Sequence, residues 1–166
     1  MTLGMSLETF TLVHVLISLV GIASGLVVVY GLLNGNRMDS WTALFLVTTV
    51  LTSATGFLFP FEHLLPSHKV GIISLVVLAI TIVARYSMHL HGPWRRIYVV
   101  GAIISLYLNV FVAVVQSFLK TPALKALAPT QTEPPFLIAQ LCVLAVFIAL
   151  GIAAAKRFRE QPVHAG

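Results

Sequence analysis

The sequence is poor in charged residues, which make up only 9% of its 166 positions. A soluble domain carries roughly 25%, so this chain has too few charges to cover a surface that faces water. Intrinsic disorder is excluded on the same grounds, because disordered chains are polar and charged. Cysteine is almost absent. The single Cys142 excludes a disulfide framework and a multi-cysteine metal site, and we expect it to be a buried thiol.

Reactive motifs are also missing. The sequence has no Walker motif, no dinucleotide-binding glycine pattern, no HExxH zinc motif and no GxSxG setting for a nucleophilic serine. Its only aspartate is Asp39, and no acidic residue falls within a predicted membrane span, which disfavours carboxylate-driven proton coupling. We therefore expect a protein without evident catalytic chemistry.

Long apolar runs dominate what is present. Hydrophobic residues make up 58% of the chain, and the mean hydropathy is +1.00. A helix needs about 20 mostly apolar residues to cross a bilayer. Five stretches meet this requirement, at about 10–33, 41–59, 69–90, 97–119 and 136–155. The sequence thus predicts an all-α integral membrane bundle of five transmembrane helices, with residues 1–166 as a single membrane domain.

Lysine and arginine are unevenly divided between the two sides of this predicted bundle. The side with the N-terminus and the proline-rich loop 120–135 has three, and the opposite side has six, or seven with Arg85. Cytoplasmic loops are enriched in positive residues, so we expect the N-terminus outside and the C-terminus inside. We expect Arg85 to reach the membrane surface from its helix end. The same bias explains the net charge of +5, so no nucleic-acid partner is needed.

Several polar residues lie within or beside the predicted spans, near the side assigned to the exterior. Polar residues at such positions are costly and suggest a functional site. We interpret these five as a candidate ligand-binding site: His14, His68, Asn109, Gln116 and Gln140. Their imidazole and amide groups could hydrogen-bond a quinone or a lipid headgroup. For Asn109 and Gln116, a hydrogen bond between helices is the alternative explanation.

Histidine also allows metal chemistry on this side. His14 and His68 could be the axial ligands of haem b. Together with Glu62 and His63 they could hold zinc or copper, although His63 and His68 lack a standard metal-binding spacing. The cofactor is therefore open between haem b, quinone, a transition metal and none.

Small residues in the spans are spaced for helix packing. Gly21 and Gly25 form a GxxxG pair on the first span, which lets another helix backbone approach closely. Thr48, Thr52 and Thr55 share one face of the second span, and we expect them to serve packing as well. The expected partners are the lipid bilayer and either further copies of the chain or a partner membrane subunit.

Two segments resemble uncharacterised small multi-pass inner-membrane proteins of bacteria. These segments are NVFVAVVQSFLK at 109–120 and LAPTQTEPPF at 127–136. The resemblance implies the bacterial inner (cytoplasmic) membrane. It implies no activity, because none is known for those proteins.

Our leading hypothesis is a multi-pass membrane protein that binds a ligand or acts as an accessory subunit, with its polar site near the outer face. The first alternative is a redox membrane protein that binds haem b or quinone through His14 and His68. The second is a metal-handling protein or an oligomeric channel.

Overall fold

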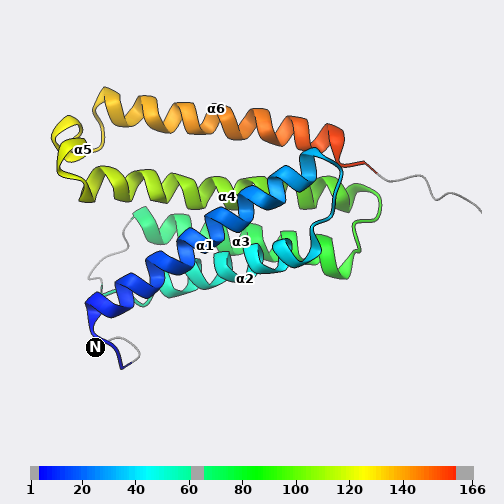
Figure 1. The fold of residues 1–166 in the computed structure, drawn as a ribbon, viewed down its shortest axis with the longest axis horizontal. Helices are drawn as coiled ribbons and strands as arrows, with labels where there is room; N and C mark the ends of the chain where they lie inside the picture. Colours follow the sequence, from blue (N-terminus) through cyan, green and yellow to red (C-terminus); the bar gives the residue numbers. More distant parts are fainter. Residues whose placement is uncertain (1–3, 61–65, 160–166) are drawn as a thin grey trace, which may run out of the picture.

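The computed structural model describes residues 4–60 and 66–159, which contain helices and no β-strand. The all-α prediction is confirmed for this part of the chain. The elements are α1 (Leu7–Leu33), α2 (Asp39–Gly56), α3 (Pro66–Ile82), the π-helix η1 (Val83–Ser87), α4 (Pro93–Lys120), the short α5 (Pro122–Leu127) and α6 (Pro134–Arg157) (Figure 1).

Four helical segments are long and apolar enough to cross a membrane. They are Leu7–Leu33, Ser67–Ser87, Pro93–Lys120 and Pro134–Arg157, and they indicate a multi-pass membrane protein. Helix α2 covers the remaining apolar stretch but is not among the four. It is 18 residues long and more polar, since it carries five threonines, two serines and Asp39. The count of five spans therefore stays a prediction.

The helix ends follow from local chemistry. The Ser6 hydroxyl accepts a hydrogen bond from the Thr9 backbone N–H at 3.2 Å and so caps the start of α1. Proline stands in the first turn of α4, α5 and α6, where its missing N–H has no helical partner to lose. After α1, Gly35 adopts a φ of +74°, which lets the chain turn sharply towards α2.

Helices α1 to α4 form a ring of neighbours. Each helix packs against the next, α4 packs back against α1, and α6 packs outside this ring against α4 and α1. The chain runs back and forth along the bundle (Figure 1). As a result, the starts of α1, α3 and α6 and the ends of α2 and α4 lie at one end of the molecule, together with α5 (Figure 1). We call this the α5 end.

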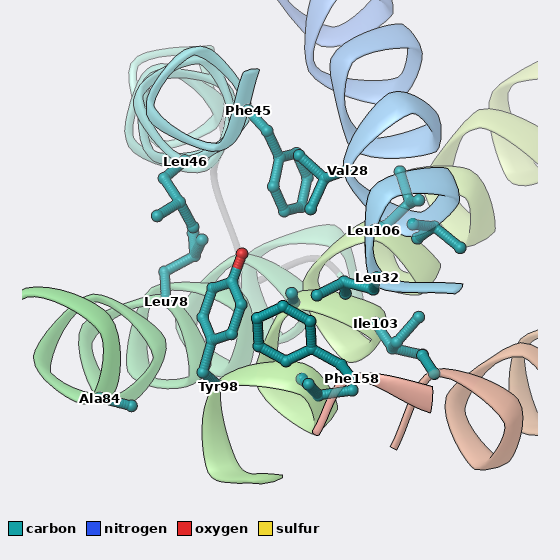
Figure 2. Close-up of a cluster of buried hydrophobic side chains, with 14 of the residues drawn as sticks. Val28, Leu32, Phe45, Leu46, Leu78, Ala84, Tyr98, Ile103, Leu106 and Phe158 are labelled. Atoms are coloured by element: carbon teal, nitrogen blue, oxygen red, sulfur yellow. The ribbon is translucent and has the colours of Figure 1, made fainter. Parts of the chain in front are cut away.

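The main core occupies the half of the ring away from α5. Figure 2 shows large side chains from several helices meeting there, among them Phe45, Leu46, Leu78, Tyr98 and Leu106. All five are buried. Bulky apolar residues therefore close this half of the ring.

The two glycines of the GxxxG pair are buried in α1 where it meets α2 and α4. A Cβ on Gly25 would lie 2.6 Å from Leu106 Cδ1 and 2.9 Å from Phe45 Cε2. A Cβ on Gly21 would lie 3.3 Å from Thr48 Oγ1. The close approach that the pair allows is thus between helices of the same chain.

Two expectations for single residues were wrong. The Arg85 side chain does not reach the membrane surface: it is only 2% exposed, forms an ion pair with Asp39 and lies over the ring of Tyr98, 5.0 Å from its centroid. It turns inward because the aromatic face of Tyr98 lies inside the bundle and the exposed carboxylate of Asp39 lies within reach at its edge. Cys142 is exposed rather than buried, because α6 packs against the ring through one face only.

Candidate functional site

A cavity of about 670 Å³ lies within the ring of α1 to α4, at the α5 end. Pockets for small molecules are typically about 300–1,000 Å³, so this volume suits one ligand. Along α4 the lining extends from Leu108 to Lys120, which is about 18 Å at 1.5 Å per residue. The cavity is therefore elongated along the bundle.

The cavity exists because small side chains stand where the other half of the ring has large ones. Small residues from all four helices line it: Ser18 of α1, Ser53 and Gly56 of α2, Gly71 and Ser74 of α3, and Ala113 of α4. None of these side chains reaches far enough to fill the space between the helices. Apolar residues such as Val15, Leu19 and Val112 complete the wall.

His14 lines the cavity from α1 and is held in a defined orientation. Its Nδ1 lies 2.8 Å from the Thr55 hydroxyl oxygen of α2. The ring of Phe59 meets the imidazole edge-on at 5.1 Å between centroids. Thr55 belongs to the last turn of α2 and Phe59 follows directly after that helix, so the end of α2 and the residues after it position the His14 ring.

His68 lines the same cavity from α3. It is 4% exposed, and its ring lies 5.5 Å from the ring of Phe57. Helix α3 faces α1 across the ring of helices, because α2 and α4 lie between them. The structure thus brings the two predicted histidines to one cavity from opposite walls.

Asn109 and Gln116 line the cavity from α4, two turns apart. The Asn109 amide nitrogen donates to the Thr49 hydroxyl oxygen at 3.2 Å. This is a hydrogen bond between helices, as the alternative explanation expected, yet the residue also faces the cavity. Four of the five predicted ligand-binding residues therefore share one site.

Gln140 is the exception. It lies on α6, outside the ring, and donates from Nε2 to the backbone carbonyl of Phe111 at 3.2 Å. Its Oε1 is buried and has no hydrogen-bond partner among the described residues. Gln140 does not line the cavity, so it belongs to the contact between α4 and α6.

The sequence-based prediction of the site omits the serines and threonines of α2 and α3, although several of them line the cavity. Ser53 of α2 and Ser74 of α3 are buried, and their hydroxyl oxygens lie 2.9 Å apart in a hydrogen bond that joins the two helices at the cavity wall. The Thr52 hydroxyl is buried at the same cavity and has no hydrogen-bond partner within residues 4–60 and 66–159. The threonine stripe was the available signal, but it was assigned to helix packing.

The predicted metal site cannot be placed, because Glu62 and His63 lie outside the described residues. Within the described ranges, no group of three or more His, Cys, Asp and Glu side chains is arranged to hold a metal ion. The metal hypothesis therefore depends on Glu62 and His63 and stays a prediction.

The loop before α6 is organised by Glu133 at the α5 end. Its carboxylate accepts hydrogen bonds from the Thr130 hydroxyl at 2.8 Å, the Thr130 backbone N–H at 3.1 Å and the Thr132 backbone N–H at 3.0 Å. Slight desolvation raises the pKa of Glu133, but these hydrogen bonds outweigh it and hold the pKa below its usual value. Gln131 ties the same loop to α4 by donating to the Val115 carbonyl at 2.9 Å.

Comparison with protein-family models, with curated proteins and with solved structures finds no match to this chain.

Proposed function

We propose that this chain is a ligand-binding or accessory protein of the bacterial inner membrane, and that it holds one amphipathic small molecule in the cavity between α1 and α4. The observation that carries the proposal is that His14, His68, Asn109 and Gln116, far apart in sequence, line one cavity of about 670 Å³.

The lining indicates an amphipathic ligand. The wall is largely apolar, with residues such as Leu19, Ile22 and Leu108, and only a few polar groups interrupt it. Apolar walls with a small number of placed polar groups are typical of small-molecule sites. Lys120 also lines the cavity, at the end of α4. A molecule with a polar headgroup and an apolar tail matches this arrangement.

The membrane topology in this proposal has five spans, with α2 as the fifth, the N-terminus outside and the α5 end at the outer face. The support is the excess of lysine and arginine on the opposite side. The ligand then enters from the outer leaflet. The apolar outer face of α6, with exposed residues such as Leu141, Ile148 and Ile152, meets lipid, a second copy or a partner subunit.

Native mass spectrometry of the protein released from mild detergent tests the proposal. We expect a bound small molecule, lost or strongly reduced in Ala113→Phe, because the new ring occupies the cavity that Ala113 lines. The matched control is Ala145→Phe on the exposed face of α6, which should retain the molecule. Retention of the same molecule by Ala113→Phe would show that it binds elsewhere. The spectra also report the number of subunits.

A second candidate function is a redox protein with haem b in the same cavity. It is favoured by the position of His14 and His68, which line one cavity from opposite helices, since axial histidines commonly hold haem iron from two sides. This candidate predicts a Soret absorption band in the purified protein that is lost in His14→Ala. A colourless preparation from cells supplied with haem precursor would exclude it.

A further inference from the structure

The hydrogen-bond roles of the His14 imidazole follow from Thr55. The Thr55 hydroxyl lies 2.6 Å from the carbonyl oxygen of Leu51. A carbonyl can only accept, so the single hydroxyl proton of Thr55 points to Leu51. The Thr55 oxygen is then an acceptor towards His14, and His14 Nδ1, at 2.8 Å, must carry the proton and donate.

This leaves the second nitrogen of His14 as an acceptor. A neutral imidazole carries one N–H, so protonation at Nδ1 makes Nε2 a bare lone pair. Among the described residues, no hydrogen bond to Nε2 of His14 is formed. The residue lines the cavity, and its Nε2 is therefore available to a ligand that donates.

Two further groups at the cavity supply both kinds of hydrogen-bonding partner. The Asn109 amide donates one N–H to Thr49, and its carbonyl oxygen and second N–H remain available. The buried Thr52 hydroxyl, unpartnered among the described residues, is available as a donor. A ligand hydroxyl satisfies such a site, because it donates one hydrogen bond and accepts another.

We infer that the ligand carries a hydroxyl group that donates to His14 Nε2, so that within the quinone class the site selects the reduced quinol over the oxidised quinone. The carbonyl oxygens of a quinone can accept from donors at the cavity such as Thr52 and Lys120, but not from the bare Nε2 of His14, because two acceptors cannot hydrogen-bond each other. The preference for quinol therefore comes from His14 alone. This inference rests on the proposed function and specifies the chemistry of its ligand.

Three probes with one carbon skeleton test the inference in detergent under anaerobic conditions. They are decyl-ubiquinol, decyl-ubiquinone and the dimethyl ether of the quinol, which has no donor. We expect the quinol to bind about 5- to 150-fold more tightly than either other probe, since an unmatched buried polar group costs about 1–3 kcal/mol. Equal affinity for quinol and quinone, tighter binding of the quinone, or no binding of any probe would overturn the inference.

The variant Thr55→Val tests the tautomer. Valine keeps the shape of threonine but removes the oxygen that holds the Nδ1 proton, so either nitrogen of His14 can then be protonated. We expect the preference for quinol to fall to less than about threefold. The matched control is Thr48→Val on the same helix. Thr48 donates to the Leu44 carbonyl in the same way but does not contact His14, so its variant should keep the preference.

The outcomes separate this inference from the proposed function. If native mass spectrometry identifies a cavity ligand that has no hydrogen-bond donor, the proposed function stands and the hydroxyl assignment fails. If Thr55→Val is too unstable to purify, Thr55→Ser, which restores the oxygen, must recover both stability and the preference for quinol. An unchanged preference in a folded Thr55→Val protein would refute the role of Thr55.

Discussion

The close contact between α1 and its neighbours can be tested by adding a single methyl group. In Gly25→Ala the new Cβ would lie 2.6 Å from Leu106 Cδ1 and 2.9 Å from Phe45 Cε2. Both distances are well inside ordinary van der Waals contact. The Phe45 ring is 1% exposed and packed in the core, so it has little freedom to move aside.

Two effects of opposite sign decide the result. Alanine is favoured over glycine within a helix by about 0.5–1 kcal/mol. Overpacking of a filled core costs about 1–3 kcal/mol. At Gly25 the clash outweighs the gain, and we expect a net loss of about 1 kcal/mol. For a chain of this size, this corresponds to a fall in Tm of about 2–4 °C.

The matched control is Gly21→Ala, one turn earlier on the same face. Its Cβ would lie 3.3 Å from Thr48 Oγ1 and 3.4 Å from Asn109 Nδ2, which small shifts can accommodate. We expect its stability within about 0.5 kcal/mol of the unmodified protein, because the helix gain offsets the tighter packing. Circular dichroism during thermal unfolding in one detergent measures both variants. If Gly25→Ala is as stable as Gly21→Ala or more stable, the tight packing of α1 against α2 and α4 is refuted.

Three further predictions concern other parts of the molecule. Gly101→Ala should lower stability by about 1–3 kcal/mol, because its new Cβ would lie 3.2 Å from the Cβ of the buried Thr81 and still closer to Thr81 Oγ1. An unchanged Tm would contradict this packing. Asp39→Asn should lower stability by about 1–2 kcal/mol, because it leaves the buried Arg85 charge without its anion. The loss is moderate because the Asp39 carboxylate is exposed to solvent. An unchanged Tm would show that other groups satisfy Arg85. Folding lowers the pKa of Glu133, so its contribution to stability is present above the unfolded pKa of about 4.5 and is lost as the pH falls through the lower folded pKa. In Glu133→Gln the fall in Tm on acidification should therefore be smaller than in the unmodified protein. Identical curves of Tm against pH for the two proteins would refute this role of Glu133.

The helices themselves could be read from the sequence, because they depend on local properties. Long, continuously apolar runs with few charges favour helices when water is absent, because a helix pairs each backbone N–H and C=O within its own segment. Proline stands in the first turn of α4, α5 and α6, a position that favours a helix start for a local reason. The membrane class and the all-α fold follow from these features alone.

The π-helix η1 and the inward turn of Arg85 could not be read in the same way. Nothing in the segment 83–87 distinguishes it from an ordinary helix end, and a positive residue near a helix end is usually expected to reach the membrane surface. The position of Arg85 depends on Asp39 and Tyr98, which are 46 and 13 residues away in the sequence and meet it only in the folded bundle.

The sequence by itself determined that this protein is a helical membrane protein with imidazole and amide side chains within or beside its apolar stretches. Tertiary structure decided which of them meet: His14, His68, Asn109 and Gln116 line one cavity, whereas Gln140 lies on α6 outside it. The physical reason is that helical periodicity defines the faces of a helix but not the rotation or neighbours of that helix in the bundle. Those are set by how all the side chains of the ring pack together.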